Sequence, residues 1–225
     1  MVESGMGEAS PRRVIAFDFD GVIADSLDAY FPVFQACCAE LGFSGPTTLD
    51  AFLDVFDTNA VKGLLRGGVP FYKLRRLGKA LTPRVVALND HVSPFPGIPA
   101  LVMALQEMHP IYVVTSNMTD ATAQFMERNG MHGLEDVVGA DRVASKVKKL
   151  RRIRKRHATS EIWYVGDTLG DMIEARQAGA ISVAACWGWH SRERLQRGNP
   201  EHLVESPAAL GRLLGVPPLE SENAI

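Results

Sequence analysis

The sequence predicts an α/β fold, in which a doubly wound parallel sheet carries an inserted all-helical domain. Three observations support this. In the second half of the chain, short apolar runs alternate with segments of helical periodicity, which is the pattern of βαβ units. The first apolar run, 14–17, is followed by two carboxylates and a glycine. Between residues 25 and 94 short helical stretches alternate with glycines and prolines, without a strand pattern.

The composition is that of an ordinary globular protein. The 225 residues are 46% hydrophobic and 22% charged, and the net charge of −2 gives no overall field that would select nucleic acid. The three cysteines, Cys37, Cys38 and Cys186, form neither a disulfide framework nor a zinc pattern. No apolar run approaches the roughly 20 residues of a membrane helix, and the N-terminus lacks the layout of a signal peptide. We expect a cytoplasmic protein that does not enter membranes.

The N-terminal half is predicted to contain one strand and several helices. The strand covers 14–19, and Ser26 is expected to cap a helix that runs to about residue 41. Further helical stretches are predicted at 49–56, 59–65, 69–77 and 83–92. We therefore divide the chain into a core domain (12–24 and 95–215), a helical domain (25–94) and two loose tails (1–11 and 216–225).

The C-terminal half alternates between the two element types. Helices are predicted at 97–108, 119–129, 145–157, 171–178, 192–197 and 207–214. Strands are predicted at 111–114, 137–138, 162–165 and 181–186. Because the helices separate the strands, the sheet is expected to be parallel.

Asp18 and Asp20 follow the first strand, two residues apart. If the extended backbone continues, their side chains point the same way, at the strand end where ligands of open α/β sheets gather. Two like charges repel there unless a cation or a shared proton intervenes. The pair suits a metal ion and a carboxylate that acts on a substrate, although an ordinary Asp-Gly turn remains the alternative.

Polar residues also follow two other predicted strands. Thr115 and Ser116 precede a helix, where hydroxyl and backbone N–H groups suit a phosphate. Asp167 and Asp171 follow the strand 162–165, and Mg²⁺ takes carboxylate and carbonyl oxygens, here from Asp18, Asp167 and the backbone near Asp20.

Charge balance gives Lys146 a function in such a site. Four carboxylates would outweigh one divalent ion and one lysine, so the lysine helps to accept a phosphate and Asp20 has a reason to hold a proton. Ordinary alternatives stay open: Thr115 as a helix cap, Asp171 as a partner of the helix dipole, and Lys146 on a solvated helix.

Together these residues resemble the haloacid dehalogenase superfamily, and within it the phosphatases with a small helical cap. The resemblance rests on Asp18-Phe19-Asp20-Gly21-Val22, Thr115, Lys146, and Gly166-Asp167 with Asp171, in the family's order. Phosphoglycolate phosphatases are most similar, and the similarity includes Ala178-Gly179-Ala180 and Trp187-Gly188-Trp189. The resemblance implies a Rossmann-like core with the helical domain as its cap.

The resemblance implies the activity of a magnesium-dependent phosphatase, a phosphoric monoester hydrolase. Asp18 would form a phosphoaspartate, and Asp20 would act as acid and then base. Asp18, the Asp20 carbonyl and Asp167 would hold Mg²⁺, and Asp171 would orient the metal shell. Thr115, Ser116 and Lys146 would bind the phosphate. The sequence departs from the family pattern after Lys146, where Val147 replaces the frequent proline.

Two other functions stay open. One is a phosphomutase similar to β-phosphoglucomutase, which shares the acid at Asp20. The other is a non-catalytic binding protein that uses the basic helix 146–156, for which a solvated face is the simpler interpretation. The substrate is expected to be a small phosphorylated metabolite, the protein a monomer or homodimer, and nucleic acid is not expected as a partner. Five cations of the helical domain face either an anionic substrate or solvent: Lys62, Arg66, Lys73, Arg75 and Arg76.

Overall fold

The computed structural model describes residues 13–158 and 161–217. The predicted tail 1–11 lies outside these residues, as does 218–225. Val216 belonged to the second predicted tail, but it is buried in the core and its N–H donates to the Gly211 carbonyl at 2.9 Å. The prediction of a loose segment is therefore wrong at this residue, because its apolar side chain finds a place against the core.

A six-stranded parallel sheet forms the centre of the fold, in the order β3-β2-β1-β4-β5-β6. Its strands are β1 (Val14–Phe17), β2 (Ile111–Val114), β3 (Asp136–Val138), β4 (Ile162–Gly166), β5 (Ile181–Ala185) and β6 (His202–Val204). The first strand lies between β2 and β4, so its carboxyl end is next to the ends of both. The predicted doubly wound α/β fold is confirmed.

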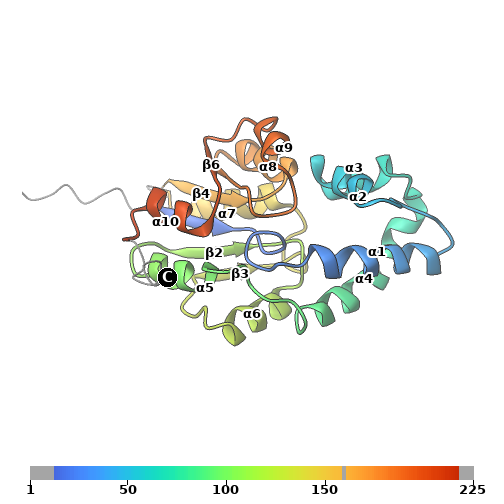
Figure 1. Ribbon diagram of the computed structural model, residues 1–225, viewed down its shortest axis with the longest axis horizontal. Helices are drawn as coiled ribbons and strands as arrows, with labels where there is room; N and C mark the ends of the chain where they lie inside the picture. Colours follow the sequence, from blue (N-terminus) through green and yellow to red (C-terminus); the bar gives the residue numbers. More distant parts are fainter. Residues whose placement is uncertain (1–12, 159–160, 218–225) are drawn as a thin grey trace, which may run out of the picture.

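Helices cover both faces of the sheet (Figure 1). Ile15 and Phe17 pack in one apolar cluster with α5 (Ile98–Gln106), α6 (Thr119–Arg128) and α10 (Pro207–Leu214). Val14 and Ala16 pack in another with α7 (Lys146–Arg156) and α8 (Leu169–Ala178). The alternation of side chains along β1 thus supplies both faces, which is why its residues are all apolar. The short helix α9 (Arg192–Gln196) packs against α8.

A helical insertion lies beside the sheet (Figure 1). In the sequence it comes between β1 and α5. It consists of α1 (Leu27–Glu40), α2 (Leu49–Leu53), η1 (Asp54–Asp57), α3 (Ala60–Arg66), η2 (Phe71–Lys73) and α4 (Leu74–Leu88). Its two connections to the sheet run side by side, because the Asp25 N–H donates to Ser93 and the Phe95 N–H donates to Ile23, both at 2.9 Å. The insertion has its own apolar cluster, which includes Phe34, Phe52 and Leu77. The domain boundaries at 24/25 and 94/95 remain predictions.

Two predicted element boundaries were wrong. The first strand ends at Phe17 rather than at residue 19, because the Phe19 carbonyl turns to accept the N–H groups of Ile23 and Ala24 at 2.9 Å. The predicted helices 69–77 and 83–92 form one continuous helix, α4, with Pro83 inside it. Leu77 and Val85 are both buried on this helix, and its packing against α1 outweighs the hydrogen bond that proline removes.

The sixth strand was not predicted. It contains three residues, His202–Val204, and it pairs in parallel with β5 at the edge of the sheet. A run this short is too brief to reveal alternation in the sequence.

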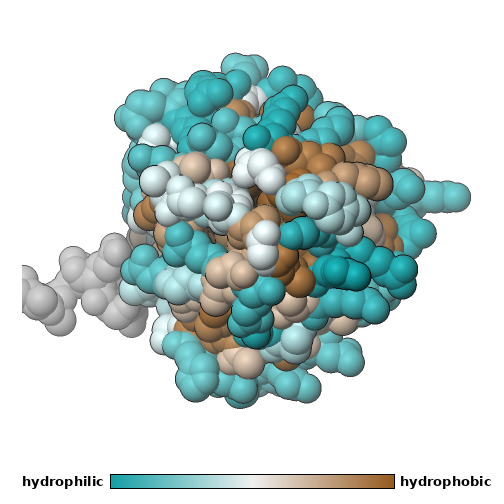
Figure 2. Space-filling view, turned by 90° about the vertical axis from the view of Figure 1, so that its right-hand side faces the viewer, coloured by the Kyte–Doolittle hydropathy of each residue, from teal (hydrophilic) through white to brown (hydrophobic). Residues whose placement is uncertain are grey.

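Of the helices that the structure describes, none is long and apolar enough to cross a membrane. Figure 2 faces the insertion and shows hydrophobic residues among hydrophilic ones, and Phe71 is 78% exposed.

The close contact between α3 and η1 leads to a stability prediction. A Cβ atom on Gly63 would lie 1.8 Å from the Val55 carbonyl oxygen, so this contact excludes any side chain. We expect Gly63→Ala to destabilise the protein by about 1–3 kcal/mol, because the backbone must shift. The measurement is the midpoint of thermal and urea unfolding. Gly78→Ala is the matched control, since its Cβ would meet nothing within 4 Å on α4, and it should stabilise by up to about 1 kcal/mol. Equal effects of both substitutions would contradict the proposed contact.

Candidate active site

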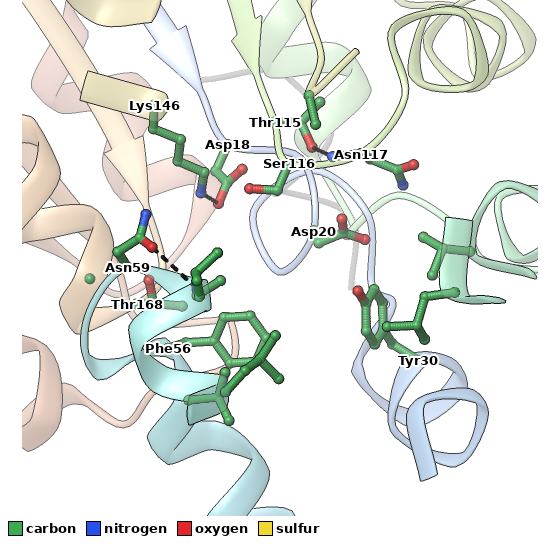
Figure 3. Close-up of a pocket in the computed structure, with 18 of the residues that line it drawn as sticks. Asp18, Asp20, Tyr30, Phe56, Asn59, Thr115, Ser116, Asn117, Lys146 and Thr168 are labelled. Atoms are coloured by element: carbon green, nitrogen blue, oxygen red, sulfur yellow. Dashed lines mark hydrogen bonds and ion pairs between the residues drawn. The ribbon is translucent and has the colours of Figure 1, made fainter. Parts of the chain in front are cut away.

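The predicted site residues gather at one cavity of about 360 Å³ between the sheet and the insertion. Six of them line it: Asp18, Asp20, Thr115, Ser116, Lys146 and Asp171. The seventh, Asp167, is fully buried beside them. Figure 3 shows the side chains from the strand ends at one end of the cavity and Phe56 and Tyr30 of the insertion at the other.

Asp18 continues directly from β1, and its N–H donates to the Val165 carbonyl of β4 at 2.8 Å. The Phe19 N–H donates to its Oδ1 at 2.8 Å, and Lys146 Nζ donates to its Oδ2 at 2.5 Å. Burial raises the pKa of Asp18 to about 7, although the Lys146 ammonium opposes this rise. The carboxylate is therefore held in one position by two donors and is poorly solvated, which suits a nucleophile.

Lys146 is the first residue of α7 and links two of the acids. Its ammonium donates to Asp18 and, at 2.7 Å, to Asp171 Oδ1. Burial disfavours its charge, but the carboxylates of Asp171 and Asp18 outweigh burial and raise its pKa well above the usual value. Lys146 therefore carries a full positive charge next to Asp18.

Asp171 is fixed by the start of α8. Thr168 caps this helix, because its hydroxyl accepts the Asp171 N–H at 3.1 Å while the Thr168 N–H donates to Asp171 Oδ2 at 3.2 Å. The Tyr164 hydroxyl donates to Asp171 Oδ1 at 2.9 Å. Burial opposes ionisation of Asp171, but Lys146 and these hydrogen bonds outweigh it and lower the pKa. The helix starts at Leu169, two residues before the predicted start, because of this reciprocal cap.

Three buried acids, Asp18, Asp167 and Asp171, offer oxygens that all lie within 4.8 Å of one another. The Trp189 N–H donates to Asp167 Oδ2 at 2.8 Å, whereas Asp167 Oδ1 is buried without a hydrogen-bond partner among the described residues. Burial, and then the charges of Asp171 and Asp18, raise the pKa of Asp167 well above its usual value. An orphaned carboxylate oxygen in a cluster of hard oxygen donors fits a divalent cation such as Mg²⁺.

The turn after β1 is shaped to fit this cluster. Gly21 has a φ of +80°, and a Cβ atom there would lie 1.9 Å from Asp167 Oδ2. Glycine is therefore required both by the backbone conformation and by the approach of the turn to the acids.

Asp20 belongs to the same turn and directly precedes Gly21. Its side chain faces the cavity together with Asp18, as Figure 3 shows, while Phe19 between them is buried against Phe125. The Ser26 hydroxyl donates to Asp20 Oδ1 at 2.8 Å. Ser26 precedes α1, but its side chain does not cap the helix, so that prediction was wrong. Burial raises the pKa of Asp20, and the hydrogen bond from Ser26 counteracts part of the rise. A carboxyl group with a raised pKa is suited to act as an acid catalyst.

Thr115 follows β2 and is buried at the same end of the cavity. Its hydroxyl oxygen accepts the Asn117 N–H at 2.9 Å, which leaves the hydroxyl proton available to a ligand. Ser116 is exposed next to it. We expected the N–H groups at the start of α6 to be available to a phosphate. The first of them, on Thr119, instead donates to Asp141 Oδ1 at 2.8 Å.

The basic helix α7 does not have the simple division that the sequence suggested. Lys146 lines the cavity, and Lys149, which the interpretation of a solvated basic face placed outside, is buried as well. The Lys149 ammonium donates to the Thr115 carbonyl, and burial lowers its pKa to about 8. Among the outer cations, Arg151 donates to the Gln177 carbonyl at 2.6 Å, which satisfies the C-terminal end of α8.

Sequence reasoning missed several residues of the cavity. Asn59 and Glu174 line it from the insertion and from α8, and Tyr30, Phe56 and Trp189 supply aromatic rings. Trp189 followed a predicted strand, which was the one signal in the sequence for any of them. The others come from helical segments whose periodicity does not distinguish a cavity from a core.

The insertion contacts the core close to the cavity. His190 accepts the Leu169 N–H on Nδ1 at 3.0 Å, and its Nε2 lies 3.0 Å from the Leu53 carbonyl. Burial and the nearby Arg194 lower the His190 pKa to about 4, so the ring is neutral and Nε2 donates. Arg194 also donates to Asp57 of η1 at 2.6 Å. These contacts hold the insertion over the strand ends.

Comparisons with known proteins agree with this arrangement. The family model described as haloacid dehalogenase-like hydrolase matches residues 15–185. A phosphoglycolate phosphatase from Synechococcus elongatus is 28% identical over 203 residues, covering 88% of this chain and 95% of the relative. Among solved structures, a hydrolase from Pseudomonas syringae has a TM-score of 0.76 at 20% identity, covering 91% of this chain and 98% of the other. A haloacid dehalogenase-like hydrolase from Streptococcus pneumoniae has a TM-score of 0.74 at 20% identity, with coverages of 90% and 97%.

Proposed function

Because this chain belongs to the haloacid dehalogenase-like hydrolase family, we propose that it cleaves a small phosphomonoester with Mg²⁺ through a phosphoaspartate on Asp18. The chain is an enzyme, a phosphoric monoester hydrolase, similar to the phosphoglycolate phosphatases. One observation carries the finer proposal: a fixed Asp18 carboxylate and a half-buried Asp20 share the cavity with Lys146, beside a cluster of three buried acids.

In the first step Asp18 is the nucleophile. One of its oxygens forms a bond to phosphorus, the bond from phosphorus to the ester oxygen breaks, and that oxygen keeps the electron pair. Asp20 gives its proton to the departing oxygen, for which its raised pKa is suited. The products of this step are an alcohol, a phosphorylated Asp18 and an ionised Asp20.

In the second step Asp20 is the base. It takes a proton from a water molecule, whose oxygen attacks phosphorus, and the bond between phosphorus and Asp18 breaks with the electron pair returning to Asp18. Thr115, Ser116 and Lys146 would hold the other phosphoryl oxygens through both steps, where donors to developing charge contribute most to the rate.

Mg²⁺ would be held by Asp18, Asp167 and the Asp20 carbonyl, with Asp171 orienting Lys146 and the metal shell. When bound, the ion neutralises charge on the transferring phosphoryl group. The unpaired Asp167 oxygen supports this assignment. Without a cation, the site would combine four carboxylates, those of the cluster and of Asp20, with one ammonium and then receive a phosphate dianion.

The test is phosphate release from p-nitrophenyl phosphate by the purified chain. We expect turnover with Mg²⁺, loss of turnover after EDTA treatment, and recovery when Mg²⁺ is added back. Turnover that resists exhaustive metal removal would contradict the metal assignment. Interconversion of glucose phosphates without net phosphate release would favour the phosphomutase. The cytoplasmic location and the choice between monomer and homodimer remain predictions, the former supported by the free thiols of Cys37, Cys38 and Cys186.

A further inference from the structure

The cavity has two chemically different ends. The end at the strand tips is polar and carries Asp18, Asp20, Thr115 and Lys146. The other end, here called the apolar wall, is formed by six side chains of the insertion: Phe34, Phe52, Val55, Phe56, Leu64 and Leu81. If the phosphoryl group occupies the polar end, the alcohol part of the ester must lie against the apolar wall.

Aromatic rings line the space next to this wall. Phe56 packs edge-on against Trp189 at 4.9 Å between ring centroids, and Tyr30 contacts Trp189 at 5.7 Å. Tyr30 and Phe56 both reach toward the space below Asp18 and Asp20 (Figure 3). Rings placed edge to face present both edges and faces to a further aromatic group. The cavity volume of about 360 Å³ lies in the range of small-molecule sites.

The cavity offers no second cation for an anionic alcohol. Of the described residues that line it, Lys146 is the only cation, and its ammonium already contacts Asp18 and Asp171. The five cations of the insertion that we considered for an anionic substrate do not line the cavity: Lys62, Arg66, Lys73, Arg75 and Arg76. Lys73 instead donates to the Leu41 carbonyl at 2.6 Å.

The other charged groups that line the cavity are acidic. Glu174 lines the cavity in addition to the acids of the polar end. A carboxylate on the substrate would therefore lose its hydration, gain no cationic partner, and approach further carboxylates, all of which disfavour binding. An apolar group gains free energy in the same place.

Resting on the phosphatase function proposed above, we infer that the substrate is the phosphate ester of an uncharged, apolar alcohol, preferably an aromatic one. Esters that carry a carboxylate, as phosphoglycolate does, are poor substrates. The site thus differs in specificity from that named for the relative from Synechococcus elongatus.

The experiment measures kcat/KM with Mg²⁺ for four esters in two matched pairs. Ethyl phosphate and benzyl phosphate differ in apolar size, and phosphoglycolate and 4-carboxybenzyl phosphate are their carboxylated counterparts. In all four esters the leaving oxygen is bonded to a CH2 carbon rather than to an aromatic ring. Differences in kcat/KM therefore report binding more than the intrinsic reactivity of the ester. We expect benzyl phosphate to exceed ethyl phosphate by roughly 10–200-fold and each carboxylate to reduce kcat/KM at least about tenfold.

Two variants test the wall itself. Phe56→Ala should lower the ratio of benzyl to ethyl phosphate turnover by about tenfold, because an aromatic surface is lost. This ratio is independent of the amount of folded enzyme. Val61→Lys places an ammonium at the cavity mouth, where Val61 lines the cavity and is 52% exposed, and should raise the relative rate of the carboxylated esters. Phe71→Ala is the matched control, since Phe71 is 78% exposed and does not line the cavity.

The outcomes separate this inference from the function on which it rests. Turnover of all four esters with equal efficiency, or preference for phosphoglycolate, overturns the inference and leaves the phosphatase function intact. Failure to release phosphate from any ester, including p-nitrophenyl phosphate, overturns both. An unchanged benzyl-to-ethyl ratio in Phe56→Ala, or a change of equal size in Phe71→Ala, also overturns the assignment of the wall.

Discussion

Asp18→Asn is expected to reduce phosphate release by roughly 10⁴–10⁶-fold, because an amide oxygen cannot act as the nucleophile. The amide has nearly the same shape, but its single oxygen can accept from only one of the two donors that hold Asp18, the Phe19 N–H at 2.8 Å and Lys146 Nζ at 2.5 Å. Burial opposes the charge of Asp18 and raises its pKa to about 7, so the neutral amide should not lower the Tm of the metal-free protein. The measurements are steady-state turnover and thermal unfolding.

A direct test of the intermediate accompanies this prediction. Acid quenching of the wild-type enzyme during turnover should give a peptide containing residue 18 that carries one phosphoryl group, and hydroxylamine should release it. Asp25→Asn is the control, since the same chemical change is made at an exposed acid seven residues further along the chain, and it should retain activity. Wild-type turnover in Asp18→Asn, or a phosphoryl group on another residue, would contradict the assignment.

Lys146→Met is expected to lower kcat by roughly 10²–10³-fold, the usual effect of removing one donor to developing negative charge. The substitution also leaves Asp18 and Asp171 without the ammonium that contacts both, at 2.5 and 2.7 Å. Two neighbouring carboxylates without a cation repel, so one of them should bind a proton more tightly. The loss of the competing ammonium favours a divalent ion more than a proton, so we expect the variant to need less Mg²⁺ for half-maximal activity, and a magnesium titration measures this.

Two further lysines of α7 provide the comparison. Lys148→Met should change kcat less than about threefold, because Lys148 is exposed on the outer face. Lys149→Met removes the buried ammonium that donates to the Thr115 carbonyl, and should lower the Tm more than Lys146→Met does. If activity depended on Lys148, or if Lys149→Met abolished turnover at an unchanged Tm while Lys146→Met stayed active, the phosphate would be bound by a different lysine.

The polar end of the cavity could be predicted almost completely from local patterns. The apolar run of β1 marks a strand that is buried on both faces, and the acids after it must lie at a strand end. The same argument applies to Thr115 after β2 and to Asp167 after β4. Parallel strands bring such residues together whatever the connecting helices are, because all carboxyl ends lie at the same edge of the sheet.

Other features depended on packing that the sequence does not express locally. Pro83 predicted a break, yet α4 continues through it because the helix buries Leu77 and Val85. Ser26 had the identity of a helix cap, but its hydroxyl donates to Asp20 instead. A lysine is usually a surface residue, but Lys149 is buried and its ammonium donates a hydrogen bond to the backbone carbonyl of Thr115.

The sequence by itself thus determined the doubly wound sheet, the helical insertion, and which acids and hydroxyl stand at the strand ends, because alternation and helical periodicity are local properties of the chain. Only the tertiary structure decided that Tyr30, Phe56 and Trp189 enclose the other end of the cavity. An apolar face of a helix looks the same in sequence whether it meets a core or a ligand. The distinction arises when segments far apart in the chain pack together and leave a space between them.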